Sequence, residues 1–342
     1  MSGIVTLTAN PSLDRTLELP GALERGSVAR LGTSHTEPGG KGVNVSRAVA
    51  AAGADVVSVL PAGDDDPIVR ALQALGLRLA TVPVADPVRT NYTLTEPDGT
   101  TTKLNEPGAR LDDGVRAALQ DAVATHAAAA SWVALCGSLP PGTPLDWYAT
   151  LVRALRSSAP GVRIAVDTSE APLLALLAAG PDAAPDLLKP NTEELAQLAG
   201  VTEEAVLADP DVALAAVATL HERGVGEVLL TLGADGAVLS TAAGELFSAR
   251  PPRITVRSTV GAGDCSLAGH LLADLAGQGA ADRLRSAVAY GAASASLPGS
   301  AVPTPTQVDG SAVRVTAGLP GSTTAPQHDT ATPVPAAGRD AR

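Results

Sequence analysis

The residue types and spacing of one segment, residues 258–264 (STVGAGD), suit the chemistry of phosphate transfer. Two glycines flank a small residue, an aspartate follows, and an apolar helical pattern comes next. Glycine lets backbone amides approach a ligand closely because it has no Cβ, and a helix N-terminus favours an anion. Asp264 is therefore a candidate general base beside a phosphate cradle. A plain Gly-rich turn capped by Asp264 is the alternative interpretation.

A second glycine-rich element lies near the N-terminus, at residues 39–44 (GGKGVN). It opens another expected helix, which begins at Val43 and ends at about Ala52. Two Gly-rich helix starts, one with Lys and Asn and the other with Asp, indicate two phosphate-bearing ligands.

Composition and charge exclude several classes of protein. A chain of 342 residues is long enough for one large α/β domain with an appendage, or for two domains. Its net charge of −12 argues against nucleic-acid partners, which need a basic surface. An anionic substrate must then be held by local positive charge.

Neither cysteine, Cys136 or Cys265, has the spacing of a metal ligand pair, and both are expected to be small buried residues. The first apolar run, residues 4–8, is too short for a signal peptide and is typical of a strand. Because no run is long enough to cross a membrane, we expect a cytoplasmic protein without a membrane partner.

Strand-like and helix-like patterns alternate along most of the chain, which predicts an α/β fold: a doubly wound, mostly parallel sheet with helices on both faces. The apolar runs expected as strands are 4–8, 56–60, 132–136, 163–167, 186–189 and 227–231, with a later hairpin at 236–240 and 245–249. The expected helices after the first are 113–128, 145–157, 171–179, 192–199, 210–224, 263–277 and 280–297.

A separate group of strands does not fit this alternation. We expect short strands at 15–19 and 27–31, and a hairpin of 90–96 and 100–105 around the turn residues 97–99 (PDG). At the other end of the chain, the Pro- and Thr-rich residues 318–342 have almost no bulky apolar side chains. They are expected to stay disordered.

Six motifs in order along residues 4 to 300 resemble the PfkB family of sugar kinases, within the ribokinase-like superfamily. They are residues 8–14 (TANPSLD), 39–45 (GGKGVNV), 137–140 (GSLP), 189–194 (KPNTEE), 231–236 (TLGADG) and 258–264. The resemblance implies a ribokinase-like α/β core of residues 1–10, 36–88 and 105–310. It also implies a small β-sheet lid of residues 11–35 and 89–104, which covers the sugar site and forms a homodimer contact. Residues 311–342 are left as a mostly disordered C-terminal tail.

The resemblance implies phosphoryl transfer from ATP to a sugar hydroxyl. Asp264 would accept the hydroxyl proton, and the backbone amides of Gly261, Ala262 and Gly263 would stabilise the migrating phosphoryl group. For Asp264 the alternative is a helix N-cap and nothing more.

The same resemblance assigns contacts to the sugar. Asp14, at the carboxyl edge of the first strand, would accept hydrogen bonds from sugar hydroxyls, and an Asx turn is the alternative. The family's second contact set for those hydroxyls matches Gly39, Gly40 and Asn44.

Cations are needed for the phosphate that the sugar already carries. Lys41 and Arg89 are the main candidates, and Ser138 would add a hydroxyl donor. Lys103 and Arg25 are further candidates on the lid strands. For each basic residue the alternative is a solvated surface charge.

The nucleotide side of the site rests on a second set of motifs. Asn191 and Glu194 form the family's N-x-x-E element and would hold a water-coordinated Mg²⁺, although a helix capping box has the same residue types and spacing. Lys189 could reach a nucleotide phosphate. The residues that match the family's nucleotide-binding turn are Thr231, Gly233 and Gly236.

The reaction expected from the resemblance converts fructose 1-phosphate and ATP into fructose 1,6-bisphosphate. It is favoured by residues 258–260 before the glycine turn and by residues 10–14. The alternatives within the family are a tagatose-6-phosphate kinase and a 6-phosphofructokinase, in which the phosphate and the reacting hydroxyl exchange ends of the sugar. Less favoured are a nucleoside or vitamin kinase and a non-catalytic sugar-phosphate sensor.

Overall fold

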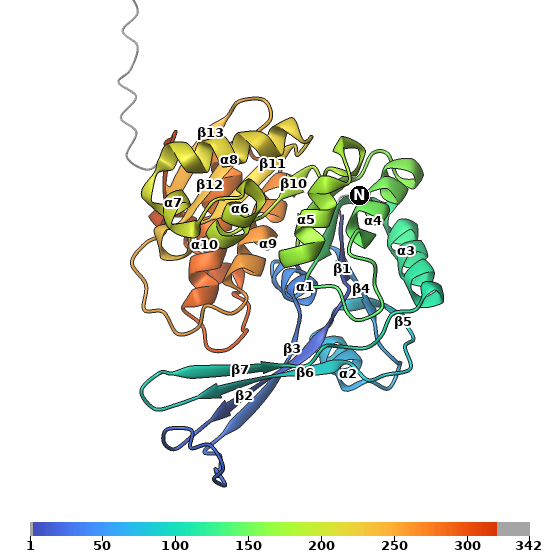
Figure 1. Ribbon diagram of the computed structural model, residues 1–342, viewed down its shortest axis with the longest axis vertical. Helices are drawn as coiled ribbons and strands as arrows, with labels where there is room; N and C mark the ends of the chain where they lie inside the picture. Colours follow the sequence, from blue (N-terminus) through green and yellow to red (C-terminus); the bar gives the residue numbers. More distant parts are fainter. Residues whose placement is uncertain (1–2, 320–342) are drawn as a thin grey trace, which may run out of the picture.

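The computed structural model describes residues 3–319, which form a ten-stranded sheet and a separate four-stranded sheet (Figure 1). The strands of the large sheet are β1 (Gly3–Thr8), β4 (Val56–Pro61), β5 (Arg78–Val82), β8 (Ala130–Cys136), β9 (Arg163–Asp167), β10 (Leu187–Leu188), β11 (Glu227–Thr231), β12 (Ala237–Thr241), β13 (Leu246–Arg250) and β14 (Arg314–Ala317). Their order across the sheet is β14-β13-β12-β11-β10-β9-β8-β1-β4-β5.

Seven neighbouring strands, from β5 to β11, are parallel, and β12 to β14 continue the sheet antiparallel. The parallel strands are joined by helices, as crossover connections require. The carboxyl ends of these strands therefore meet at one edge of the sheet, which is where open α/β sheets bind ligands.

The helices are α1 (Lys41–Ala51), α2 (Pro67–Ala74), α3 (Asp113–Ala127), α4 (Trp147–Ser158), α5 (Glu170–Ala178), α6 (Thr192–Ala199), α7 (Glu203–Ala208), α8 (Pro210–Glu222), α9 (Ala262–Leu275) and α10 (Ala280–Ala295). α1, α9 and α10 pack together on one face of the large sheet, and α3, α4, α5, α6 and α8 cover the other. The doubly wound α/β fold expected from the sequence is thus confirmed.

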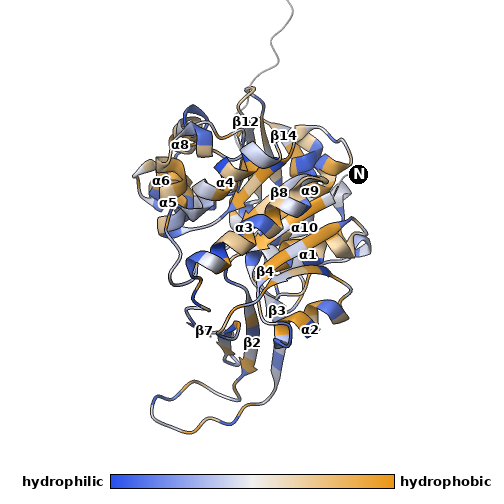
Figure 2. Ribbon diagram, turned by 90° about the vertical axis from the view of Figure 1, so that its right-hand side faces the viewer, coloured by the Kyte–Doolittle hydropathy of each residue, from blue (hydrophilic) through white to orange (hydrophobic). Residues whose placement is uncertain are grey.

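Alternate residues of the parallel strands feed two hydrophobic layers. Val5 and Leu7 of β1 pack with the α3–α4 layer, whereas Ile4 packs with the α1–α9 layer. Figure 2 shows this apolar interior between the sheet and its helices. The chain is only 2% aromatic, so aliphatic side chains fill most of both layers. Among the described helices, none has the length and apolar character needed to cross a membrane.

The four-stranded sheet, called the small sheet below, consists of β2 (Ser12–Glu18), β3 (Ser34–Gly39), β6 (Arg89–Thr95) and β7 (Thr101–Asn105). β2 pairs antiparallel with β3 and parallel with β6, and β6 pairs antiparallel with β7. The small sheet projects from the α/β body at its lower end in Figure 1, and most of its residues are half-buried or exposed.

Three expectations need correction. Residues 27–31 do not form a strand; the partner of β2 is β3, at residues 34–39. The strand β5 and the helices α2 and α7 were not expected. The tail was expected from residue 311, but β14 pairs with β13 because Val313 is buried and Val315 packs against the α10 layer. The remainder of the expected tail, residues 320–342, lies outside the described residues.

Candidate active site

Asp264 stands in the first turn of α9, close to the carboxyl edge of the large sheet. The N-cap of α9 is Gly261, whose φ of 78° lies in the left-handed region that favours glycine. Asp264 is therefore three residues into the helix and does not cap it. Its carboxylate is buried, and its Oδ2 accepts a hydrogen bond of 2.9 Å from Nδ2 of Asn44 on α1. Of the three amides expected in the phosphate cradle, that of Ala262 also donates to the carbonyl of Thr259, at 3.3 Å.

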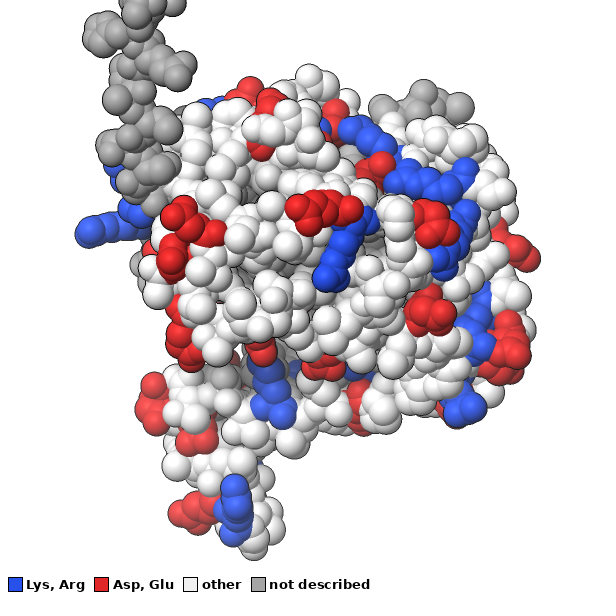
Figure 3. Space-filling view, turned by 45° about the horizontal axis from the view of Figure 1, so that its top comes forward, with Lys and Arg blue, Asp and Glu red and all other residues white. Residues whose placement is uncertain are grey.

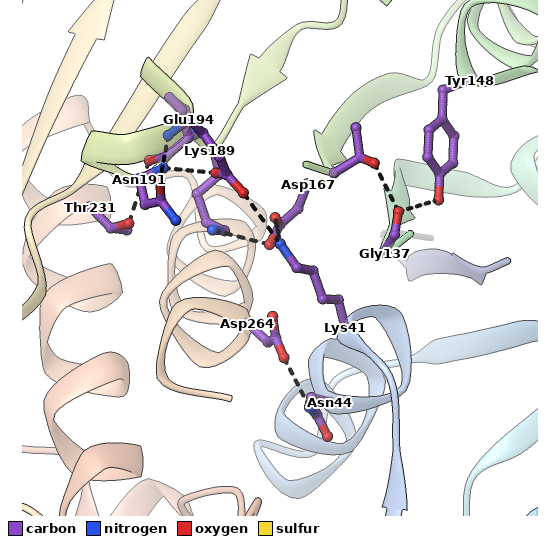
Figure 4. Close-up of polar contacts among 12 residues, drawn as sticks. Lys41, Asn44, Gly137, Tyr148, Asp167, Lys189, Asn191, Glu194, Thr231 and Asp264 are labelled. Atoms are coloured by element: carbon purple, nitrogen blue, oxygen red, sulfur yellow. Dashed lines mark hydrogen bonds and ion pairs between the residues drawn. The ribbon is translucent and has the colours of Figure 1, made fainter. Parts of the chain in front are cut away.

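A buried carboxylate, Asp167 at the end of β9, holds two lysines beside this base (Figure 4). Lys41 Nζ lies 2.7 Å from Asp167 Oδ1, and Lys189 Nζ lies 3.1 Å from Asp167 Oδ2. A Cβ placed on Gly263 would lie 3.4 Å from Lys189 Nζ, so this ammonium group borders the glycine loop. Two positive charges are thereby held at Asp167, and that of Lys189 borders the glycine loop of α9.

The environments of the two aspartates drive their pKa values apart. Burial, and then the charge of Asp167, raise the pKa of Asp264 to about 6. Burial also opposes ionisation of Asp167, but Lys189 and Lys41 outweigh it and hold its pKa below the usual value. When the pKa values of two neighbouring carboxyl groups differ in this way, one group stays ionised and the other can take up a proton near neutral pH.

Lys41 was expected to bind the sugar's own phosphate, and in the structure its ammonium group is surrounded by carboxylates. Its second ion pair is with Glu194 Oε1, at 3.9 Å, and its ammonium group also feels the charge of Asp264. Burial lowers the pKa of Lys41, but these three carboxylates reverse the effect and raise it above its usual value. The ammonium group therefore faces the centre of the site, between the base and the N-x-x-E element.

The expected sugar contacts gather where the small sheet meets the body. Asp14 lies within β2, so it is not the residue of an Asx turn. Its Oδ1 accepts hydrogen bonds from Ser12 Oγ at 2.8 Å and Asn91 Nδ2 at 3.0 Å. A Cβ on Gly39 would lie 2.1 Å from Asp14 Oδ2, so a larger residue there would displace the Asp14 carboxylate. Gly40, with a φ of 106°, then leads into α1.

Arg89 begins β6 and binds only backbone carbonyl groups. Its Nη1 donates to the carbonyl of Glu106 at 3.1 Å, and its Nη2 donates to that of Asn10 at 3.2 Å. Within residues 3–319, its buried Nε has no hydrogen-bond partner and no carboxylate forms an ion pair with it. Burial lowers the pKa of Arg89, although Asp14 and Glu106 partly oppose this. The guanidinium group is thus a cation without a paired anion at the base of the small sheet.

Within residues 3–319, the side chains of the remaining basic candidates form no hydrogen bond or ion pair with the other site residues. Lys103 is an exposed residue of β7, and Arg25 is exposed in the segment between β2 and β3. Ser138 follows Gly137, whose carbonyl is held by Tyr148 Oη and Thr168 Oγ1, each at 2.9 Å. Asn10 Nδ2 donates to Ser138 Oγ at 3.3 Å, which links this turn to the end of β1.

A cavity of about 700 Å³ joins the expected nucleotide turn to the glycine loop of α9. Its size is within the range of sites that bind small molecules and cofactors. The sequence-predicted residues on its wall are Asn191, Thr231, Gly233, Gly236, Ala262 and Gly263. Apolar residues on its wall include Ile254, Val256 and Val288, a surface suited to the face of a purine ring.

Asn191 and Glu194 form the capping box of α6. Asn191 Oδ1 accepts from the amide of Glu194 at 2.7 Å, and Glu194 Oε2 accepts from the amide of Asn191 at 2.9 Å. Burial raises the pKa of Glu194. The other carboxylate oxygen, Oε1, takes no part in the capping box and lies 3.9 Å from Lys41 Nζ. It fits an Mg²⁺ held through water, because Mg²⁺ is usually bound by few carboxylates, several waters and phosphates. Among the described residues, no three acidic, His or Cys side chains cluster as direct ligands.

Two residues of the site were not anticipated. Asp167 is the last residue of a correctly predicted strand, and a charged residue at the carboxyl end of a buried parallel strand could have indicated it. Asn91 follows Arg89 by two residues on β6, so the two side chains share a face of the small sheet. On the face shown in Figure 3, basic and acidic side chains are interspersed, in accord with phosphate binding by such local groups.

Comparison with known proteins places this geometry in a family. The model for pfkB family carbohydrate kinases matches residues 8–307. The 1-phosphofructokinase of Xanthomonas campestris pv. campestris is 37% identical over 268 residues, which are 78% of this chain and 82% of that protein. The ATP-dependent 6-phosphofructokinase isozyme 2 of Escherichia coli K12 is 34% identical over 86% of this chain and 92% of its own.

The solved structure of phosphofructokinase-2 from Escherichia coli in complex with substrates and products aligns with a TM-score of 0.81 at 30% identity. The alignment covers 89% of this chain and 96% of that one. The family match spans most of the described residues, and the relatives are similar over nearly their whole length. The chain therefore belongs to the pfkB family of carbohydrate kinases, which are phosphotransferases acting on a sugar hydroxyl.

Proposed function

We propose that this protein transfers the γ-phosphoryl group of ATP to fructose 1-phosphate and forms fructose 1,6-bisphosphate. The observation that carries the proposal is the position of Asp264. It is a buried carboxylate whose pKa is raised to about 6, beside two lysines and directly after Gly263, which lines the cavity that reaches the nucleotide turn. A phosphotransferase needs this combination of a proton acceptor and fixed positive charge.

In the proposed mechanism, Asp264 accepts the proton of the attacking sugar hydroxyl, and Asn44 orients the carboxylate through its hydrogen bond. The amides of the glycine loop bind the migrating phosphoryl group, with Lys41 and Lys189 on its other side. Asp167 holds these two ammonium groups in place and neutralises part of their charge while the site is empty.

The sugar is assigned to the region between Asp264 and the small sheet. Asp14 and Asn91 would bind its hydroxyl groups, and Gly39 leaves room for the Asp14 carboxylate. Arg89 is the best candidate for the phosphate that the sugar carries, because its guanidinium group has no paired carboxylate. Ser138 would add a hydroxyl donor, and Lys103 and Arg25 remain candidates only if the small sheet or a partner subunit moves toward the site.

Magnesium would be held through water by Glu194, beside the ATP phosphates, and when bound it would neutralise charge on those phosphates. Lys189 and Asn191 would contribute to the nucleotide phosphates. Thr231, Gly233 and Gly236 would form the turn beneath the nucleotide.

The choice of fructose 1-phosphate is supported by the 1-phosphofructokinase name of the relative at 37% identity. The 6-phosphofructokinase relative at 34% identity supports the second candidate, a kinase of fructose 6-phosphate. Both reactions would use the same base and the same phosphate cradle. They differ in the orientation of the sugar, because the phosphate and the reacting hydroxyl exchange ends.

A homodimer through the small sheet is part of the proposal. Large apolar side chains are exposed on this sheet and on the segment between β2 and β3, namely Leu23, Val28, Leu31 and Leu104. Exposed large apolar groups on one part of a molecule are consistent with a subunit contact there. Light scattering of the purified protein tests this state, and a monomer at micromolar concentration would contradict it.

The function itself is tested by product identification. Purified protein, MgATP and fructose 1-phosphate are mixed, and the phosphorus NMR spectrum of the products is recorded with the same reaction on fructose 6-phosphate in parallel. We expect fructose 1,6-bisphosphate and ADP to form faster from fructose 1-phosphate. Faster turnover of fructose 6-phosphate would select the second candidate, and no sugar product from either substrate would contradict the proposed function.

A further inference from the structure

Arg47 on α1 connects the candidate base to two distant segments of the chain. Its side chain is only 8% exposed, although it does not touch the proposed ligand cavity. Its Nη1 donates to Asn44 Oδ1 at 3.3 Å, to the carbonyl of Pro38 at 3.0 Å and to that of Ser300 at 3.1 Å. One guanidinium group thus joins α1, the end of β3 and the loop after α10.

The contact with Asn44 decides which way its amide points. Asn44 Nδ2 donates to Asp264 Oδ2 at 2.9 Å, while its Oδ1 faces Arg47. If the amide were turned over, its oxygen would face the Asp264 carboxylate and its NH₂ group would face a guanidinium group. Because arginine stays charged and has no acceptor, it permits only the orientation in which Asn44 donates to the base.

Arg47 is itself held in place by a fixed anion. Glu37 Oε1 lies 3.7 Å from Arg47 Nη2. Glu37 Oε2 accepts hydrogen bonds from the amide and the hydroxyl of Ser300, at 3.0 and 3.1 Å. A Cβ on Gly299 would lie 2.7 Å from Glu37 Oε2, so the loop approaches the carboxylate closely. The chain of contacts therefore runs from Glu37 through Arg47 and Asn44 to Asp264.

We propose that Arg47 is a positioning residue for the phosphotransferase reaction, which acts by fixing the Asn44 amide as a hydrogen-bond donor to Asp264. This inference rests on the proposed role of Asp264 as the base. Without Arg47, the amide can turn and the base loses a donor that stabilises its ionised form. The base then becomes harder to ionise and less well aimed at the sugar hydroxyl.

The test uses four variants: Arg47→Met, Asn44→Ala, the double variant, and Arg70→Met as a matched control on the exposed face of α2. For Arg47→Met we expect kcat to fall by about tenfold to a hundredfold, the effect of a small misplacement in an active site. We also expect the acidic limb of the pH profile of kcat/KM to move to higher pH. Arg70→Met should match the unmodified protein.

The pH profile separates positioning from a general loss of structure. Asp264 is also faced by Asp167, Lys41 and Lys189, none of which changes in these variants. Asn44→Ala should move the acidic limb in the same direction as Arg47→Met. The double variant should be no worse than Asn44→Ala alone, because residues that act through one another are not additive.

Additive losses in the double variant, or an acidic limb that stays in place in Arg47→Met, would overturn the inference. If Arg47→Met does not fold, Arg47→Lys serves instead. Lysine keeps the charge but cannot reach several acceptors at once, so the limb should still move, by less. Failure of the proposed function would be recognised separately. An inactive unmodified protein, or a fully active Asp264→Asn variant, would contradict the assignment of Asp264 as the base.

Discussion

The centre of the site and the small sheet differ in how their charges are held. At the centre, Asp167, Lys41 and Lys189 form a chain of ion pairs, and Asp167 is completely buried. In the small sheet, the Arg89 side chain binds carbonyl groups and no carboxylate within residues 3–319, and Lys103 is exposed, as is Arg25 in the segment between β2 and β3. Among the described residues, the lysines at the centre are paired with Asp167, whereas the cations of the other region form no ion pair with a carboxylate.

This difference indicates a division of tasks. Groups that stabilise a transition state act best when they are fixed in advance, because no energy is then spent on reorganisation. Groups that recognise a substrate can remain unpaired until it binds, since the ligand supplies the missing partner. We therefore expect changes at the centre to act mainly on kcat and changes in the small sheet to act mainly on KM.

The largest effect is expected for Asp264→Asn. Turnover should fall by about 10²–10⁴, the usual range for loss of a general base, while the Kd values for ATP and sugar phosphate change little. Burial raises the pKa of Asp264 from its usual value of 3.8 to about 6. Ionisation of Asp264 therefore lowers the free energy of unfolding as the pH rises from 3.8 to about 6, and this loss persists at higher pH. The variant should therefore melt no lower than the unmodified protein at pH 8. Near-normal turnover would remove Asp264 from its role.

Lys41→Met should have the next largest effect. We expect kcat to fall by about 10²–10³, as when a group that stabilises transition-state charge is removed. Lys189 remains to pair with Asp167, so the fold should persist, and thermal melting checks this. A large rise in the KM for sugar phosphate with unchanged kcat would instead place Lys41 on the sugar's own phosphate and end its assignment to the centre.

Arg89→Ala should act on substrate affinity. A charge-assisted contact with phosphate contributes about 1.5–3 kcal/mol, so the KM for sugar phosphate should rise by about tenfold to a hundredfold while that for ATP stays the same. Arg15→Ala, at an exposed residue of β2 in the same sheet, is the matched control, and we expect it to change either KM by less than about threefold. A raised KM for ATP in Arg89→Ala would assign Arg89 to the other ligand.

The smallest effect concerns pH. The base must be ionised to accept a proton, so kcat/KM should rise as pH increases through about 6, the pKa of Asp264, and level off above it. Steady-state rates between pH 5 and pH 8, corrected for ionisation of the sugar phosphate, check this. A flat profile down to pH 5 would mean that Asp264 is not the group that takes the proton.

Local motifs predicted the parts of this molecule that depend on neighbouring residues. The glycine turn before Asp264, the capping box of Asn191 and Glu194, and the strands of the parallel sheet other than β5 all have local signatures. The small sheet was harder to place: its strands have no fully buried face, so hydrophobic alternation specifies their boundaries weakly, and β3 was expected too early.

The direction of Lys41 and the role of Asp167 could not be predicted, because both depend on contacts between segments more than a hundred residues apart. β14 is a similar case, because it pairs with β13 although α9 and α10 lie between the two strands in the sequence.

The most direct test of the account compares kcat/KM for fructose 1-phosphate and free fructose with the unmodified protein at saturating MgATP. Free fructose leaves Arg89 without its anion in the substrate complex, and an unpaired partly buried charge is costly. We expect fructose 1-phosphate to be preferred by at least about a thousandfold, the effect of roughly 4 kcal/mol. Comparable values for the two sugars would contradict the assignment of a phosphate-binding group to the small sheet.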